Sequence, residues 1–254
     1  MVKIYISSLI ILLLLCSPIP GEPLLKSDKK SFIVGVENIN YFPMYGLEKG
    51  KYSGYAREIL DAFASDHGYT FYYKPLPILR LYKDLLVNQT VDFKYPDNTF
   101  WKKDLKNGKN ISYSISVVDY IDGVMVLPAN RGRGLKRFKR LGTIIGFTPW
   151  EYLDDIKAGN IKHDKAPHYD CIIKMALAKR VDGAYSCVSV MNFQLEKMNK
   201  GGALVFDPVL PHTKSSYLLS SVKHPLIIKQ FSGWLGRRKA FVDRLKGKYK
   251  IGAE

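Results

Sequence analysis

The chain has 254 residues, 46% of them hydrophobic and 13% aromatic, which is enough for one large domain or two small lobes with a core. Its 39 lysines and arginines outnumber 23 aspartates and glutamates, giving a formal charge of +16 that points to an anionic partner or surface. The basic residues are scattered, with the densest run RGRGLKRFKR at 131–140, and no recognition helix or ribonucleoprotein motif is present, so the charge favours a solvated basic face and argues against nucleic-acid binding.

The N-terminus predicts a secretory signal peptide over residues 1–21. Lys3 is the only charge before the apolar run ISSLIILLLLCS, which Pro18 interrupts too early for a membrane span of about 20 residues. Cys16 offers a lipoprotein acceptor as the alternative, but Leu15 stands where that motif needs a small residue. We therefore expect an exported, periplasmic protein without a lipid anchor, and a monomer.

Strand and helix patterns alternate along the remaining chain. β-Branched and apolar runs predict strands, and apolar residues at helical spacing predict helices. The expected strands cover 31–37, 69–76, 90–96, 120–128, 142–147 and 181–190, and the expected helices cover 53–68, 78–89, 170–180 and two segments within 223–251. Thr148, with Pro149 after it and Glu151 three residues on, predicts a capped helix start. The repeated βαβαβ order predicts an α/β protein.

Two cysteines remain after the signal peptide. Cys171 begins the predicted helix 170–180, and Cys187 lies near the end of the strand that follows it. A helix packed antiparallel to its following strand brings these ends together, and an exported protein favours oxidation, so we predict a disulfide, with two buried thiols as the alternative. The histidines show no metal-binding spacing, and we expect no metal and no cofactor.

Several segments together resemble bacterial extracellular solute-binding proteins of family 3, the polar amino-acid-binding type. The first is VGVENINYFPMYGLEKGKYSGYAREILDAFASDHG, which is similar to the family's opening strand, aromatic loop and first helix. The others are LRLYKDLLVNQTVD, ISYSISVVDYIDGVMVLP, AKRVDGAYS and SSYLLSSVKHPLI. The resemblance implies a type II periplasmic-binding-protein-like α/β fold, with two lobes joined by two crossing segments. Lobe 1 would hold 22–122 plus 214–254, and lobe 2 would hold 123–213.

The resemblance also implies a ligand cleft beyond the carboxyl ends of the strands. Arg80 begins a helix at a position where some relatives place an arginine at the cleft, and its alternative role is an ion pair with Asp84 four residues on. The stretch KYPDNTFWKK would supply rings and an amide. The full set of expected ligand-binding residues is Tyr41, Phe42, Arg80, Tyr95, Asn98, Trp101, Thr148, Trp150, Tyr185 and Ser186.

Two departures from the family bear on the ligand. Amino-acid binders usually carry an arginine a few residues before the "fS" pair, but the chain from Tyr95 to Tyr113 has only lysines. They usually carry an aspartate after the second-lobe strand, where this chain has Ser186 and Cys187. Both features argue against a standard amino acid and favour an anionic, aromatic or modified solute.

Three classes of function follow from these patterns. The first is a binding protein without catalytic residues that captures a small polar solute, for an ABC-type transporter permease or a membrane sensor. The second is a dehydratase-like enzyme on the same fold, for which Glu37 and Asp97 are the nearest acid–base candidates. The third is an orphan receptor that acts through protein contacts.

Overall fold

The computed structural model describes residue 1 and residues 30–252. The predicted signal peptide, and with it Cys16, lies outside the described residues. Within the described part, no helix combines the length and the apolar character needed to cross a bilayer.

The described chain alternates strands and short helices, as the patterns predict. The strands are β1 Lys30–Glu37, β2 Gly46–Glu48, β3 Lys51–Ser53, β4 Tyr69–Leu76, β5 Phe93–Asp97, β6 Ser112–Tyr113, β7 Val118–Val126, β8 Arg140–Ile144, β9 Lys162–Ala166, β10 Gly183–Cys187, β11 Val205–Phe206 and β12 Thr213–Ser221. The α-helices are α1 Tyr55–Asp66, α2 Ile78–Leu86, α3 Lys103–Lys106, α4 Leu153–Lys157, α5 Tyr169–Leu177, α6 Val188–Lys197, α7 Pro225–Arg237 and α8 Lys239–Lys248.

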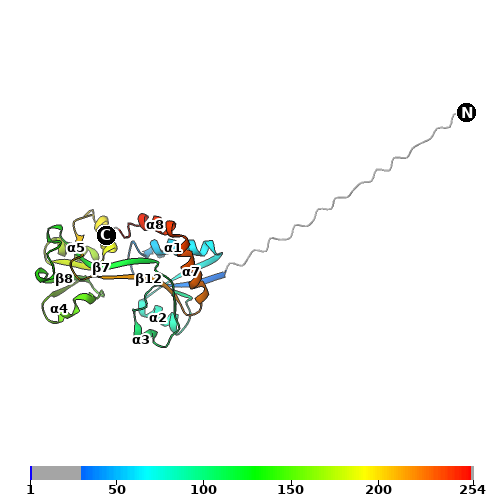
Figure 1. The fold of residues 1–254 in the computed structure, drawn as a ribbon, viewed down its shortest axis with the longest axis horizontal. Helices are drawn as coiled ribbons and strands as arrows, with labels where there is room; N and C mark the ends of the chain where they lie inside the picture. The colour runs from blue at the N-terminus through cyan, green and yellow to red at the C-terminus, as the bar shows by residue number, and fades with distance from the viewer. Residues whose placement is uncertain (2–29, 253–254) are drawn as a thin grey trace.

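These elements form two lobes, each built on its own part of one sheet (Figure 1). The strand order is β4-β1-β5-β12-β7-β10-β8-β9, with parallel pairs at both outer ends and antiparallel pairs at the centre. The chain therefore has the predicted two-lobed α/β architecture of type II periplasmic binding proteins.

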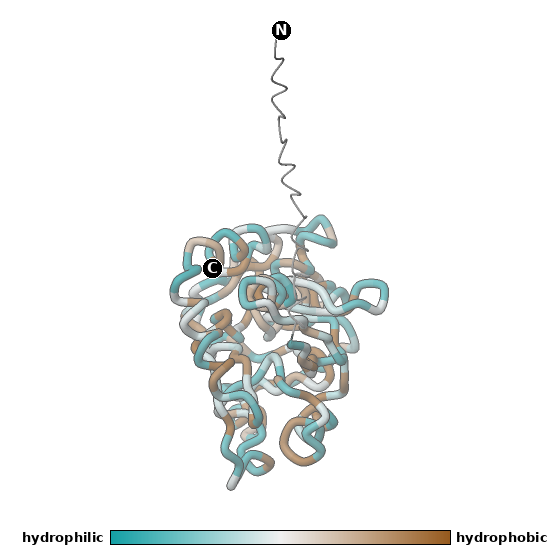
Figure 2. The backbone as a smooth tube through the Cα atoms, turned by 90° about the vertical axis from the view of Figure 1, so that its right-hand side faces the viewer, coloured by the Kyte–Doolittle hydropathy of each residue, from teal (hydrophilic) through white to brown (hydrophobic). Residues whose placement is uncertain are grey.

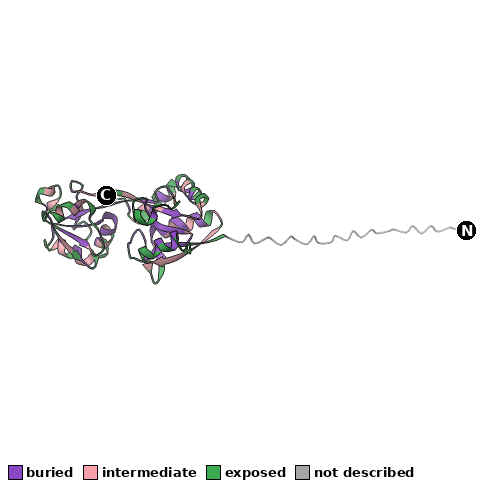
Figure 3. Cartoon of the chain, turned by 90° about the horizontal axis from the view of Figure 1, so that it is seen from below, coloured by how far each residue is buried: buried purple, intermediate pink, exposed green. Residues whose placement is uncertain are grey.

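Each lobe has a core of buried strands covered by helices (Figure 3). In lobe 1, Phe63 of α1 packs against Phe231 and Trp234 of α7, with ring centroids 4.9 and 5.9 Å apart. In lobe 2, one face of the sheet packs on α5 and α6 through Ile172 and Met191. Many of the loops that project from the outline are hydrophilic (Figure 2).

The strands β7 and β12 run antiparallel from one lobe to the other (Figure 1). β12 pairs with β7 over 213–217 and with β5 of lobe 1 beyond that point. Asp122 and Thr213 are paired directly, and the predicted lobe boundaries fall immediately after these two residues. The division of the chain at these points remains our proposal.

Two predicted elements of lobe 2 are wrong in part. The strand predicted over 181–190 ends at Cys187, and helix α6 begins at Val188. The prediction extended the strand too far because valines at 188 and 190 favour a strand, whereas the segment VSVMNFQLEK folds as a helix. The capped start at Thr148 is absent. A short 3₁₀ turn begins at Trp150 after Pro149 without a side-chain cap, and α4 starts only at Leu153.

The predicted disulfide is also wrong, since Cys171 and Cys187 are not bonded to each other. Cys187 is fully buried and packs in the large aromatic core that includes Tyr41 and Tyr217. Cys171 is half-buried and packs against the separate core of α5 and α6. The two side chains thus belong to different cores, which the expected approach of helix start and strand end did not take into account.

Candidate functional site

The paired strands β7 and β12, which join the lobes, carry polar and aromatic side chains on one face. Side chains alternate between the faces of a strand, and directly paired residues share a face. The register therefore places five residues on one side of the ribbon, which we call the crossover face: Tyr120, Asp122, Thr213, Ser215 and Tyr217. Tyr120 and Tyr217 stack with ring centroids 4.3 Å apart.

Lobe 1 borders the crossover face with aromatic side chains. Tyr41, 8% exposed, packs in the same core as Tyr217, and burial raises its pKa well above the usual tyrosine value. The ring of Trp101 lies edge-on to Tyr217 at 5.8 Å. Asn98 donates from its amide to Ser215 Oγ and to the Ser216 carbonyl, both at 2.9 Å. Tyr41, Asn98 and Trp101, all predicted site residues, therefore meet at this surface.

Lobe 2 borders the same surface through β10. Cys187 pairs directly with Asp122, and Tyr185 pairs with Val124, so Cys187, Tyr185 and Asp122 share one face of the sheet. The Tyr185 hydroxyl donates to Glu151 Oε2 at 2.6 Å. Tyr185, another predicted site residue, thus positions a carboxylate that the sequence patterns did not select.

Asp122 is the acidic residue of the crossover face, and its surroundings disfavour its charged form. Its Oδ1 is shielded from solvent and accepts no hydrogen bond from the described residues. Burial, and then the negative charge of Glu151, raise the pKa of Asp122 to about 7. None of the ion pairs formed within residues 30–252 includes Asp122 or Glu151. Two carboxylates between the lobes thus have no cationic partner in this part of the chain.

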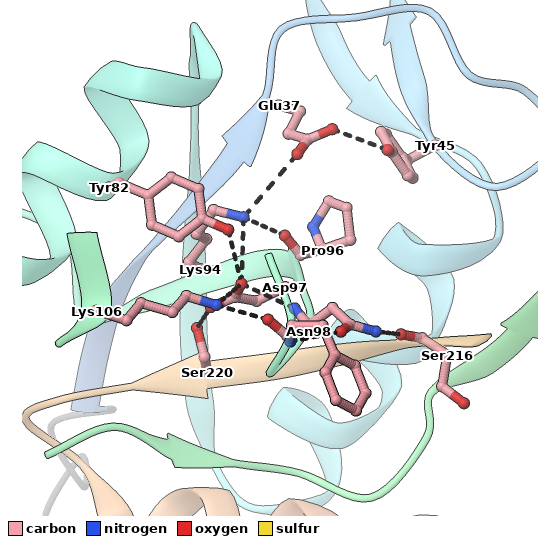
Figure 4. Close-up of polar contacts among 11 residues, drawn as sticks. Glu37, Tyr45, Tyr82, Lys94, Pro96, Asp97, Asn98, Lys106, Ser216 and Ser220 are labelled. Atoms are coloured by element: carbon pink, nitrogen blue, oxygen red, sulfur yellow. Dashed lines mark hydrogen bonds and ion pairs between the residues drawn. The ribbon is translucent and has the colours of Figure 1, made fainter. Parts of the chain in front are cut away.

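A second polar cluster fills the carboxyl ends of β1 and β5 inside lobe 1 (Figure 4). We call it the charge network and define it as Glu37, Lys94, Asp97 and Lys106. Lys94 is fully buried, and its Nζ lies 3.9 Å from both Glu37 Oε1 and Asp97 Oδ1 and donates to the Pro96 carbonyl. Lys106 Nζ lies 2.8 Å from Asp97 Oδ1.

Hydroxyl donors complete the charge network. Tyr82 and Ser220 donate to the two oxygens of Asp97 at 2.9 and 2.7 Å, and Tyr45 donates to Glu37 at 2.9 Å. Burial alone would raise the pKa of Asp97, but the charges of Lys94 and Lys106 and the hydrogen bonds outweigh it and lower that pKa. Burial raises the pKa of Glu37, opposed by Lys94.

The charge network leaves little room for an acid–base role. Asp97 is held by two lysines and two hydroxyls, and Glu37 by Lys94 and Tyr45. A paired and hydrogen-bonded carboxylate is what burial of a charge requires, so the arrangement has a structural explanation. The enzyme alternative therefore loses its two sequence candidates.

The remaining predicted site residues do not belong to the crossover face. Arg80 forms the alternative ion pair, with Nε 2.9 Å from Asp84 Oδ1, so its contact with a ligand stays a prediction. Tyr95 is fully buried in the lobe 1 core. Phe42 stacks on Phe193 of α6 at 6.0 Å and thereby joins the two lobes.

Three more predicted residues belong to lobe 2. Ser186 is fully buried on the opposite side of β10 from Tyr185, and its hydroxyl lies 3.1 Å from that of Tyr169. Thr148 and Trp150 are exposed, and Trp150 keeps 70% of its surface in solvent. They lie in the loop that carries Glu151.

The sequence patterns missed Asp122, Glu151, Tyr120 and Tyr217 as site residues. Asp122 carried a signal, because a carboxylate within the apolar strand YIDGVMV is costly to bury unless it has a partner. Tyr217 carried none, since the pairing of β12 with β7 is needed to place it over Tyr120.

A separate hollow of about 430 Å³ opens beside α3. It is lined mainly by polar and basic side chains, among them Lys103, Lys106 and Lys109. Lys106 belongs to the charge network, while Lys103 and Lys109 are exposed. We call this surface the basic hollow.

No protein-family model matches the sequence, and a search of curated proteins gives no match. Solved structures do match. An ancestral arginine-binding protein bound to arginine is similar at 18% identity and a TM-score of 0.61, over 86% of this chain and 97% of that one. The second substrate-binding domain of Lactococcus lactis GlnP, in an open conformation, is similar at 13% identity and 0.63, over 87% and 96%.

A third similar structure is the ancestral amino-acid-binding protein AncCDT-1, described as a precursor of cyclohexadienyl dehydratase. It shares 17% identity at a TM-score of 0.61, over 86% of this chain and 95% of that one. At identities this low, the likeness concerns the fold. The described chain has the two-lobed fold of these amino-acid-binding proteins.

Proposed function

We propose that this protein is an exported solute-binding protein that captures a small polar solute between its lobes. The observation that carries the proposal is the crossover face, where Asp122 and a set of aromatic side chains lie at the junction of the lobes. Ligands of open α/β folds bind at the carboxyl ends of strands and between domains. The similar structures bind amino acids, which supports a solute of that size.

The predicted signal peptide supports a periplasmic location. There, the protein would hand its solute to a membrane permease of the ABC type or to a membrane sensor. GlnP substrate-binding domain 2 is named as a substrate-binding domain, in keeping with such a role. No sequence motif identifies the membrane partner.

A thermal-shift screen tests the proposal directly. The chain from residue 22 onward is heated with amino acids, small acids, amines and aromatic metabolites. A solute that binds only the folded state raises stability by RT ln(1 + [L]/Kd), about 2.7 kcal/mol at a hundredfold excess over Kd. We expect one chemical class to raise the melting temperature. No shift from any class would overturn the proposal.

A second candidate function is an enzyme of the dehydratase type on the same fold. The observation that favours it is Asp122, whose pKa of about 7 suits a general acid or base at neutral pH. Incubating the stabilising solute with the protein and analysing it by mass spectrometry separates the two functions. Recovery of unchanged solute supports binding alone, and conversion that Asp122→Asn abolishes supports the enzyme.

A further inference from the structure

The charge of the crossover face is opposite to that of the chain. Lysines and arginines outnumber acidic residues 39 to 23 in the sequence, yet Asp122 and Glu151 pair with none of those described. A carboxylate shielded from water is costly unless it is paired or hydrogen-bonded. With so many cations in the chain, a pair of unmatched carboxylates at the lobe junction indicates that the matching positive charge comes from the bound solute.

The hydrogen bonding of Asp122 narrows the kind of cation. Its Oδ1 accepts no hydrogen bond from residues 30–252, so this buried acceptor is free to accept a hydrogen bond from a ligand. A protonated amine or a guanidinium has N–H groups to donate, whereas a quaternary ammonium has none. Tyr185 holds Glu151 by a 2.6 Å hydrogen bond, which fixes a second negative charge near the same place.

The aromatic side chains around Asp122 suit a cation as well. Tyr120 and Tyr217 form a stacked pair, and Trp101 lies edge-on to Tyr217. Aromatic ring faces attract ammonium and guanidinium groups and cover the carbon chain that bears them. The negative faces of the same rings would not attract an anion.

The crossover face includes no cation, and three cations of lobe 1 are already paired with acidic side chains of the chain. Lys106 and Lys94 are buried in the charge network against Asp97 and Glu37, and Arg80 is held by Asp84. A carboxylate placed over the crossover face would instead meet Asp122 and Glu151 and be repelled. We infer that the solute is a small organic cation with N–H donors and without a carboxylate, an inference that rests on the function proposed above.

The test uses pairs of probes that differ only in the carboxylate. Agmatine is arginine without its carboxylate, and 1,5-diaminopentane is lysine without it. Calorimetric titration of the chain from residue 22 onward should give at least tenfold tighter binding of the decarboxylated member in one or both pairs. Tetraethylammonium should bind at least tenfold more weakly than the better diamine or guanidine.

Two variants locate the effect. Asp122→Asn removes the charge with almost no change in shape, and should weaken binding of the best probe at least tenfold. Asp119→Asn is the matched control, because Asp119 lies on the same strand but on the opposite face, where it accepts hydrogen bonds from Ser116 and Ser216. The Asp119→Asn variant should bind the best probe as tightly as the natural chain does. If Asp122→Asn does not fold, Glu151→Gln should still weaken binding several-fold.

The possible outcomes separate this inference from the proposed function. If arginine bound as tightly as agmatine, and lysine as tightly as 1,5-diaminopentane, or if the amino acids bound more tightly, the inference that the solute has no carboxylate would be wrong. Binding of the best amine probe that is unchanged in the Asp122→Asn variant would overturn the role of the crossover face. If an anionic or neutral solute bound and no amine did, the inference of a cationic solute would be wrong, but the proposed solute-binding function would stand. If no solute bound at all, both the inference and the proposed function would be wrong.

Discussion

Lys106 places its Nζ 2.8 Å from Asp97 Oδ1, inside lobe 1, so the positive charge of this lysine is paired within the chain. The same ammonium donates to the Asn98 carbonyl at 2.6 Å. The stretch KYPDNTFWKK, together with Lys106 just beyond it, therefore contributes to an internal charge network as well as to a border of the crossover face.

Removing the charge of Lys106 should destabilise the fold. Lys106→Met leaves Lys94, at 3.9 Å, as the one cation paired with the buried Asp97 among the described residues, so the free energy of unfolding should fall by about 3 kcal/mol. Lys109→Met is the control, because its exposed side chain should change stability by less than about 0.5 kcal/mol. Urea titrations followed by circular dichroism measure both, and equal stability of the two variants would contradict the role of the pair.

Asp122 should make the folded state less stable as the pH rises. Its folded pKa of about 7 lies above its ordinary value near 4, so its contribution is fully present below pH 4 and is lost as the pH rises towards and through 7. The titratable groups around it are Tyr41, Tyr120, Glu151, Tyr169, Tyr185, Cys187 and Tyr217, none of which is a cation.

The Asp122→Asn variant isolates this effect from the other carboxyl groups. The free energy of unfolding of the variant, minus that of the natural chain, should become more positive between pH 4 and pH 8, with a slope of up to about 1.4 kcal/mol per pH unit. Denaturant titrations at four pH values provide the comparison. A difference that stays constant with pH would show that Asp122 is charged in the fold at all of them.

The cysteines should both react as thiols after export. Cys171 and Cys187 are not bonded to each other, so the chain from residue 22 onward, unfolded without a reductant, should take up two alkyl groups from iodoacetamide. Mass spectrometry counts them. Uptake only after reduction would establish the disulfide that the helix–strand pattern predicts.

Much of the fold could be predicted from the sequence because its elements are locally encoded. The apolar spacing of Tyr55, Ile59 and Phe63 predicts α1, and the β-branched run of β1 predicts the strand beside it. The 188–197 helix could not be predicted, since a start rich in valine favours a strand and only packing on the lobe 2 core overrides it.

The site was less predictable, because it depends on pairing between distant strands. Tyr41, Asn98 and Trp101 could be placed near a cleft, as they follow lobe 1 strands. The direct pairing of Asp122 with Thr213 and with Cys187 joins segments 65 to 91 residues apart, and no local pattern encodes it. The sequence also could not show that Lys94 and Lys106 form ion pairs inside lobe 1, because these pairs depend on the burial of Asp97.

Hydrogen exchange measured by mass spectrometry, with and without the best-stabilising solute, tests most directly whether the solute binds between the lobes. The account predicts slower exchange in peptides that cover Val118–Asp122, Thr213–Tyr217 and the end of β10, since these strands carry the crossover face. Slower exchange confined to the basic hollow around Lys103–Lys109, with the crossover strands unchanged, would contradict it.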